Sequence, residues 1–241
     1  MKNRIQLLQK IACAVGIVLL TAGSASADLV YSTDFDISYA ATNGATVFDG
    51  TTIAPESCFG SGNNVSVAAG DLTLGNTAQN RYRGAGVWLD ATAWAAGTVT
   101  VTFEASNFTA GTDSADIFQV FAANGVDASN TVSLDLHGAQ GLDGDPVATG
   151  SATIAMLGTE QTFTGSTTAT PSTESLTFTY NGTDQYIALV FANSNAPSTG
   201  TGNTVDIDNL TVTTAASIPE PSSLALLGLG SLFLVSRRRH V

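Results

Sequence analysis

The stretch Thr98-Val99-Thr100-Val101-Thr102-Phe103-Glu104-Ala105 alternates between polar and apolar side chains along its whole length. Because successive side chains of a β-strand point to opposite faces, its apolar members share one face and its threonines and glutamate share the other. This pattern predicts a strand with one face in a core and one face in water. No long stretch of residues 28–217 carries the 3.6-residue apolar period of an amphipathic helix.

Related patterns recur along the rest of the chain. Alternation predicts strands at 132–136 and 176–180, and apolar runs predict strands at 117–121 and 186–191, the last of them central and buried on both faces. Turn-forming pairs separate the segments: Asn43-Gly44, Asp49-Gly50, Asn124-Gly125, Asp143-Gly144 and Asn181-Gly182. About ten strands without intervening helices predict an all-β fold, a two-layered antiparallel β-sandwich of jelly-roll type.

The last predicted strand, residues 204–213, changes its alternation halfway. Its apolar side chains occupy odd positions and then even positions: Val205, Ile207, Leu210 and Val212. A bulge near Asp208-Asn209 would restore a common inward face. The segment Val-Asp-Ile-Asp-Asn-Leu-Thr-Val resembles the closing strand of carbohydrate-binding-module-like jelly rolls. This resemblance implies pairing with the opening strand, here at 29–35.

Charge is distributed unevenly along the chain. Of the eight Lys and Arg residues only Arg81 and Arg83 lie within 28–217, whereas of the 20 Asp and Glu residues only Glu220 lies outside it. The segment therefore holds 19 acidic and two basic side chains, a formal charge of −17. Such a field repels nucleic acid and favours cations and neutral partners such as uncharged glycans. Acidity that only keeps an exported protein dispersed is an equal alternative.

The N-terminus has the organisation of a signal peptide. Three basic side chains precede an apolar run at 11–20, for which we expect a signal helix. Ala25 and Ala27 supply the small residues that signal peptidase accepts at positions minus three and minus one. We therefore expect residues 1–27 to be a signal peptide that is removed during export.

The C-terminus combines a turn, a short apolar segment and a basic cluster. Pro219 and Pro221 lack backbone donors and disfavour helix before them, so a helix begins only after Pro221. Residues 222–235 then predict about 21 Å of helix, a marginal span for a hydrocarbon core of about 30 Å. Leucines surround its axis, which favours a membrane helix over a buried amphipathic one. The basic cluster leaves the C-terminus in the cytoplasm; it consists of Arg237, Arg238 and Arg239.

The order Pro219-Glu220-Pro221, apolar segment and arginine cluster resembles the PEP-CTERM sorting domain of Gram-negative bacteria. The resemblance covers residues 217–241. It implies tethering to the inner membrane and handling by an exosortase, a membrane cysteine peptidase that cuts near Pro-Glu-Pro, before the protein reaches the cell surface or the medium. We therefore expect a signal peptide at 1–27, one β-sandwich domain at 28–216 and a sorting and anchor segment at 217–241.

Aspartates near both ends of the predicted sandwich raise the hypothesis of a structural calcium site. Asp34, Asp36, Asp206 and Asp208 would converge if the first and last strands pair, and Ca²⁺ takes six to eight oxygen ligands. The alternative is a set of solvated edge carboxylates. A second pair, Asp143 and Asp145, lacks the twelve-residue calcium-loop pattern. We expect no other cofactor.

Catalytic signatures are sparse, and we expect no enzyme activity. Residues 28–217 hold one histidine, His137, and one cysteine, Cys58, which nearly excludes a zinc site. No Gly-x-Ser-x-Gly elbow occurs, and a segment without lysine has no phosphate-binding loop of the Walker type. A glycosidase needs only two carboxylates, so counting leaves that class open. The glutamates available to it are Glu56, Glu104, Glu160 and Glu174.

Aromatic side chains are the candidates for glycan contact, because sugar rings stack on them. They are Trp88, Trp94 and Tyr82, with Tyr39 as a further candidate. The alternative is that the tryptophans are core residues, as large aromatics usually are.

Three functional classes remain. The first, which we favour, is an exported, cell-surface or matrix-associated protein without catalytic activity. The second is a carbohydrate-binding module of the exopolysaccharide or biofilm matrix, an association implied only by the family resemblance. The third is a carbohydrate-active enzyme, either a glycosidase or a lyase.

Overall fold

The computed structural model of the protein describes residues 27–36, 39–40, 46–51, 58–61, 65–68, 70–75, 84–109, 116–134, 146–192 and 204–215. Asp28–Ala215 form one compact unit, and every strand pair in it is antiparallel, as predicted. No helix occurs in the described ranges, so none of them supplies a helix that could span a membrane. The predicted signal helix and the predicted helix at 222–235 lie outside these residues.

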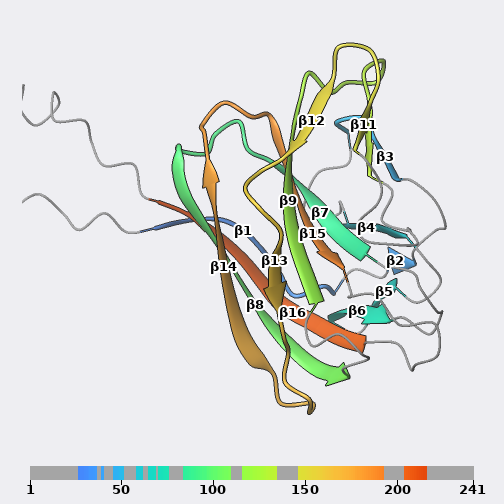
Figure 1. The fold of residues 1–241 in the computed structure, drawn as a ribbon, viewed down its shortest axis with the longest axis vertical. Coiled ribbons are helices and arrows are strands. Elements are labelled where there is room, and N and C mark those ends of the chain that lie inside the picture. The colour runs from blue at the N-terminus through green and yellow to red at the C-terminus, as the bar shows by residue number, and fades with distance from the viewer. Residues whose placement is uncertain are drawn as a thin grey trace, which may run out of the picture. The chain divides into compact units, whose positions relative to one another are not determined.

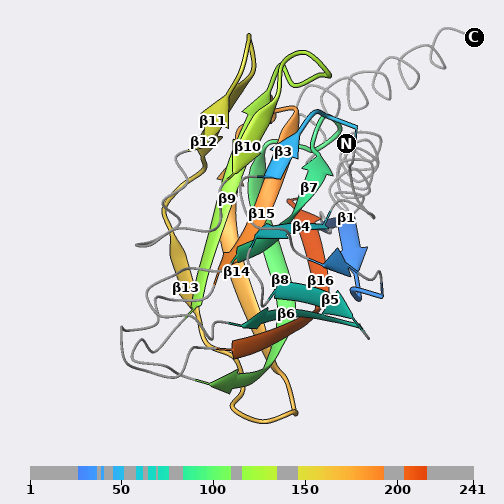
Figure 2. The ribbon, with the colours of Figure 1, turned by 90° about the vertical axis from the view of Figure 1, so that its right-hand side faces the viewer.

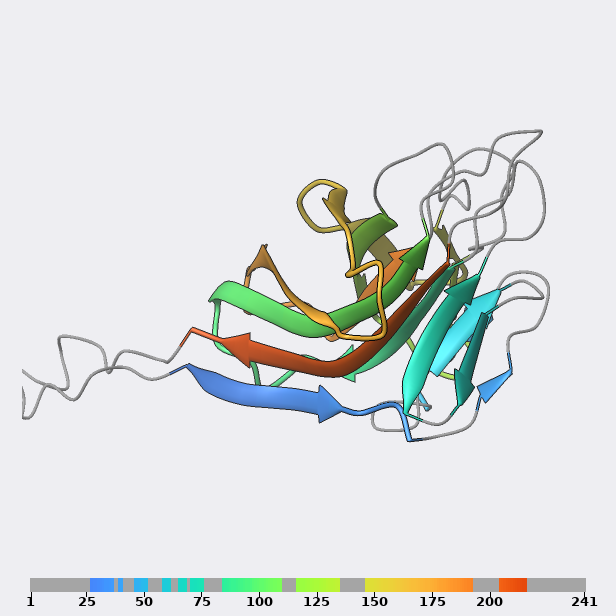
Figure 3. The same ribbon diagram turned by 90° about the horizontal axis from the view of Figure 1, so that it is seen from below.

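The largest sheet, sheet A, has seven strands (Figures 1 and 3). Its order is β14 (Ser172–Tyr180), β8 (Gly97–Thr109), β16 (Thr204–Thr214), β6 (Asp71–Gly75), β5 (Val65–Ala68) and β2 (Tyr39–Ala40), and β1 (Asp28–Thr33) also pairs with β16. The predicted pairing of the first and last strands is therefore confirmed. Figure 3 shows the blue β1 alongside the red β16.

Two further sheets complete the unit, as Figure 2 shows. Sheet B has the order β12 (Thr153–Met156), β9 (Asp116–Asn124), β15 (Tyr186–Ala192), β7 (Gly84–Asp90) and β4 (Cys58–Ser61), and β13 (Gln161–Phe163) also pairs with β9. Sheet C has three short strands in the order β11 (Val147–Ala148), β10 (Val132–Leu134) and β3 (Thr46–Phe48).

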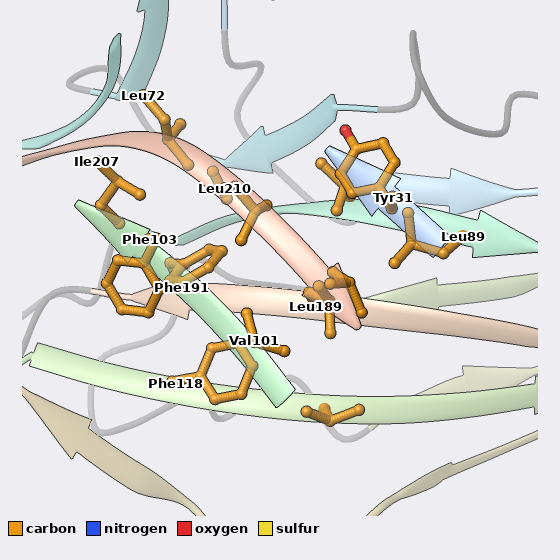
Figure 4. Close-up of a cluster of buried hydrophobic side chains, with 14 of the residues drawn as sticks. Tyr31, Leu72, Leu89, Val101, Phe103, Phe118, Leu189, Phe191, Ile207 and Leu210 are labelled. Carbon is orange, nitrogen blue, oxygen red and sulfur yellow. The ribbon is translucent and has the colours of Figure 1, made fainter. Parts of the chain in front are cut away.

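The first core lies between sheets A and B. Alternate side chains of β8 and β16 point into it from one side, and alternate side chains of β9 and β15 from the other (Figure 4). Phe103 of β8 packs edge to face against Phe191 of β15, with ring centroids 5.1 Å apart. The alternating pattern that predicted β8 therefore corresponds to a half-buried strand.

A second core covers the other face of sheet B. Its side chains come from β7, β9 and β15 on one side and from β3 and β10 on the other. The rings of Phe48 and Trp88 stack across it, 4.3 Å apart and nearly parallel. The central strand predicted at 186–191 is confirmed, because every residue of β15 is buried. The prediction of two layers was incomplete, since the apolar outer face of sheet B requires a third layer, sheet C.

The predicted bulge in the last strand is also present. The register between β16 and β8 shifts between Asp208 and Thr211, and Asn209 has a left-handed backbone with φ of 49°. The extra residue brings the apolar side chains of both halves of β16 onto the core face. All four are fully buried: Val205, Ile207, Leu210 and Val212.

Candidate functional site

The outer face of sheet A is a polar surface on which hydroxyl side chains predominate, with the exposed Leu29 of β1 beside them, opposite Thr213. β8 supplies the polar members of the stretch that predicted it, and the strands on either side supply their partners. Cross-strand partners share a face, and the register aligns Thr177, Thr100 and Thr213 in one row. A second row consists of Ser175, Thr102, Thr211 and Ser32.

Beside these rows, the same face carries a cluster of carboxylates. Glu104 of β8 lies opposite Asp208 of β16 in the register. The side-chain amide of Asn209, at the bulge, donates hydrogen bonds to Oε2 of Glu104 at 2.9 Å and to Oδ2 of Asp208 at 3.1 Å. The bulge residue therefore bridges two carboxylates that would otherwise repel each other.

Asp206 is held separately by neighbours on both sides of β16. Thr73 Oγ1 donates to one carboxylate oxygen at 2.8 Å, and Asn107 Nδ2 donates to the other at 2.7 Å. Asn107 has a left-handed backbone with φ of 52°, which Asn tolerates better than most residues. The outer face of sheet A is thus shaped by asparagines at two irregular positions.

Asp71, at the start of β6, belongs to the same cluster, although no sequence pattern predicts that it does. Partial burial raises its pKa above the ordinary aspartate value, and the negative charges of Asp206 and Asp208 add to the rise. The carboxylates of β6 and β16 are neighbours because these two strands pair. They concentrate negative charge at one end of the face.

A cavity of about 360 Å³ opens where β1 leaves β16. β1 ends there because Phe35 adopts a left-handed backbone with φ of 51°, an unusual conformation for a bulky residue, while its ring is buried in the first core. The cavity is lined by Ser32, Thr33, Asp34, Asn209, Leu210 and Thr211. It therefore joins the hydroxyl rows to the bulge.

The four aspartates of the calcium hypothesis do not form a metal-ligand set. Although β1 and β16 pair, Asp34 lines the cavity, whereas Asp206 lies further along β16, where β6 has replaced β1 as its neighbour. Asp36 lies beside Gly70, at the turn that precedes β6. Within the described ranges no three His, Cys, Asp or Glu side chains are placed to hold a metal ion. Asp143 and Asp145 lie outside those ranges.

The aromatic candidates for glycan contact lie elsewhere. Trp88 is 2 % exposed in the second core, and Trp94 is 8 % exposed in the first, where it packs edge to face against Tyr180 at 5.7 Å. A sugar ring could not stack on either indole while the cores are intact. The burial supports the alternative that both are core residues. Tyr82 lies outside the described residues, and only the backbone of Tyr39 is described, in β2.

The glutamates considered for catalysis are dispersed. Glu104 lies in the carboxylate cluster, Glu160 accepts a hydrogen bond from Gln119 Nε2 at 3.1 Å, and Glu174 lies on edge strand β14. Glu56 lies outside the described residues. Only Glu104 has a second carboxylate opposite it, that of Asp208.

A second polar cluster lies near the other end of β8. Tyr180, opposite Gly97, shares its one hydroxyl hydrogen between two acceptors, the carbonyl oxygens of Ala91 at 2.9 Å and Asp184 at 2.7 Å. Burial raises the pKa of the Tyr180 hydroxyl, with the nearby carboxylates of Asp184 and Asp90 adding to it. Both acceptors are backbone carbonyls next to strands of sheet B, so this hydroxyl joins the two sheets of the sandwich.

Comparison with known proteins identifies the C-terminal segment. Residues 217–239 match the family described as the PEP-CTERM protein-sorting motif, which confirms the resemblance of that segment. The match includes Pro219, Glu220, Pro221 and the three arginines. Such a motif implies export, a C-terminus anchored in the membrane before processing, and sorting by an exosortase. No curated protein matches the chain.

Solved structures similar to the chain are β-sandwich domains, including carbohydrate-binding modules. The CBM22-1 xylan-binding domain of Paenibacillus barcinonensis Xyn10C is 13% identical, with 81% of this chain and 99% of that one covered and a TM-score of 0.36. The K3 cleaved adhesin domain of Lys-gingipain from Porphyromonas gingivalis is 14% identical, with 78% and 100% covered and a TM-score of 0.36. Scores this low carry no argument about ligands.

Proposed function

We propose, from the sorting motif matched at residues 217–239, that the chain is a non-catalytic β-sandwich protein displayed at the cell surface or released outside the cell. The motif supports the route, and the acidic segment 28–217 suits a protein that stays dispersed outside the cell. Signal peptidase would act after Ala27 and an exosortase near Pro219-Glu220-Pro221.

Maturation of the tail tests this proposal. In the native host, mass spectrometry of the exported protein should find no peptide from residues 1–27 and a C-terminus near Pro221. Replacing both Pro219 and Pro221 by Ala should leave the full-length form in the membrane fraction. The matched control is Pro171→Ala, which changes an exposed proline of the sandwich. Recovery of the unprocessed wild-type chain from the cytosol would contradict the proposal.

The absence of catalysis is part of the proposal. Glu104 and Asp208 form the one opposed carboxylate pair discussed above, but neither lines the described cavity. The full-length chain incubated with polysaccharides should therefore release no new reducing or unsaturated ends. Activity that disappears in Glu104→Gln would establish the enzyme alternative.

A second candidate function is the binding of a neutral glycan. The observation that favours it is the uncharged hydroxyl surface of sheet A, which adjoins a cavity with one carboxylate and one amide. Neutral glycans offer hydroxyl groups that pair with such side chains, and binding should be insensitive to salt because no ion pairs form. A glycan array probed with the full-length chain at low and high salt tests this candidate, which fails if no glycan is retained.

A further inference from the structure

We infer that the cavity at the end of β1 and the row of four hydroxyls that leads into it form one site for a single neutral polysaccharide chain. We call Ser175, Thr102, Thr211 and Ser32 the hydroxyl track. The inference rests on the proposed glycan binding and adds to it a location, a direction and the residues that do the binding.

The geometry of sheet A connects the track to the cavity. The four residues are successive cross-strand partners on β14, β8, β16 and β1, so they form a line across the strands. With neighbouring strands about 4.8 Å apart, three steps make a track of about 14 Å. Its last two members, Thr211 and Ser32, also line the cavity. A polysaccharide that lies along the track, across these four strands, therefore reaches the cavity at its β1 end.

The cavity is open to solvent, so it suits a ligand that lies on the surface. Its volume of about 360 Å³ is large enough for a sugar ring. Asp34 contributes a carboxylate that accepts hydrogen bonds, and Asn209 contributes an amide oxygen that can accept them, since its NH2 group already donates to Glu104 and Asp208. The side chain of Leu210 points into the first core, so the polar groups of the lining are the ones that a ligand can reach. This set suits the hydroxyls around the edge of a sugar ring, which can donate to the acceptors and accept from Ser32, Thr33 and Thr211.

The charges on and around the hydroxyl track favour a neutral polymer as the ligand. The track itself carries no ionisable side chain, while the carboxylates of Glu104, Asp208 and Asp206 lie on the same face beside it. Residues 28–217 also carry a formal charge of −17, so an anionic polysaccharide would be repelled along its whole approach. A cationic polymer would be drawn to the carboxylates and away from the track.

The affinity of such a site is modest. Hydroxyls that face water exchange one hydrogen bond for another on binding, so each contributes only a few-fold to affinity. Repeated contacts along one chain, and many copies of the protein at a surface, would raise the effective affinity. The site therefore suits reversible attachment to a polymer matrix better than capture of a free small sugar.

Affinity electrophoresis and calorimetry with the full-length chain test the inference. The probes are the neutral polymers xylan, dextran and galactomannan, with alginate as the anionic comparison. The double variant Thr102→Val/Thr211→Val removes two hydroxyls and keeps their shape, and we expect roughly tenfold weaker binding to the neutral polymer retained. Asp34→Asn should weaken binding by a few-fold, because an amide replaces a pure acceptor. Thr162→Val, an exposed threonine of β13 in sheet B, is the matched control and should bind as wild type does.

Each outcome has a separate meaning. If the wild-type chain binds none of the neutral polymers, glycan binding itself is overturned and the inference with it. If it binds but the double variant binds equally well, glycan binding stands and the hydroxyl track is rejected as its site. Preference for alginate would reject the neutral polymer. Thermal melting of each variant shows whether the fold is intact, and a folded double variant with weakened binding supports the inference.

Discussion

The outer faces of sheets A and B differ, because one is exposed to water and the other is buried. On sheet A the outward side chains are mostly Thr, Ser, Asp, Glu and Asn, with the exposed Leu29 among them, and this face meets water. On sheet B the outward side chains include Trp88, Ala188 and Val190, and a third sheet buries them. In this sandwich, a further layer therefore covers the sheet whose strands do not alternate polar and apolar side chains. A polar surface remains where the alternation is kept.

The same difference bears on where a partner could bind. In a two-layered sandwich the indole of Trp88 would face outward, where a sugar could stack on it. The ring of Phe48 occupies that position instead. The aromatic face has become a core and is closed to a partner, whereas the hydroxyl and carboxylate face of sheet A is open to one.

Substitution of Trp88 should have the largest effect on stability. We expect Trp88→Ala to lower the free energy of unfolding by about 3–5 kcal/mol, because it empties the contact between sheets B and C. Thr100→Ala, on the outer face of sheet A, should change it by less than about 0.5 kcal/mol. Chemical denaturation of the full-length variants measures both values. Equal effects at the two positions would show that sheet C does not bury the outer face of sheet B.

The bulge of β16 is a second test of the difference between the two faces. It keeps the apolar side chains of this strand inward, and the outer face of sheet A polar, through a change of register. Asn209→Val should cost about 1–2 kcal/mol, since a β-branched residue resists the left-handed backbone observed there. Asn209→Gly should be tolerated within about 0.5 kcal/mol because Gly adopts this conformation readily. The same denaturation assay separates the two variants. A similar loss in both would assign the cost to the bridging hydrogen bonds rather than to the backbone.

We expect the smallest change in stability at Glu174. This acidic side chain lies on the core side of sheet A, whereas the other acidic side chains discussed for this sheet lie on its outer face. It lies opposite Phe103, on the core side of edge strand β14, and burial raises its pKa above the ordinary value of 4.5. The folded state therefore binds a proton at higher pH than the unfolded state does, and stability rises as the pH falls through the window between these two pKa values. An inward carboxylate at an edge also discourages pairing with another strand.

Denaturation midpoints of the wild type and Glu174→Gln between pH 7 and pH 4 test this expectation. The variant should show a smaller gain in stability on acidification. Identical pH profiles would mean that Glu174 is as well solvated in the folded chain as in the unfolded one. Asp71, whose pKa is also raised, contributes a gain of the same sign in both proteins.

Much of the fold could be predicted, because strict alternation of polar and apolar side chains predicts both a strand and the face that it turns to the core. The half-buried β8, the fully buried β15, the pairing of β1 with β16 and the bulge at Asn209 all followed from such local patterns or from the resemblance of the last strand. Sheet C could not be predicted, since its strands are two or three residues long and carry too little pattern.

The candidate site was less accessible to sequence reasoning, because it depends on which strands become neighbours. Asp71 joins Asp206 and Asp208 only because β6 pairs with β16, and the cavity exists only because the chain turns away at Phe35. Trp88 was a candidate for glycan contact, with a core position as the favoured alternative. The signal that could have decided was the unbroken apolar character of β7 and β15, which left no face of sheet B for water.

The position of β16 determines how the sandwich responds to mechanical load. This strand leads directly to the sorting segment and is hydrogen-bonded on both sides, to β8 on one and to β6 and β1 on the other. A pull on the tail runs along the strand axis and must shear two ladders at once instead of peeling one edge open. While the chain is anchored through this segment before processing, the attachment therefore resists a pull better than one through an edge strand such as β14 would.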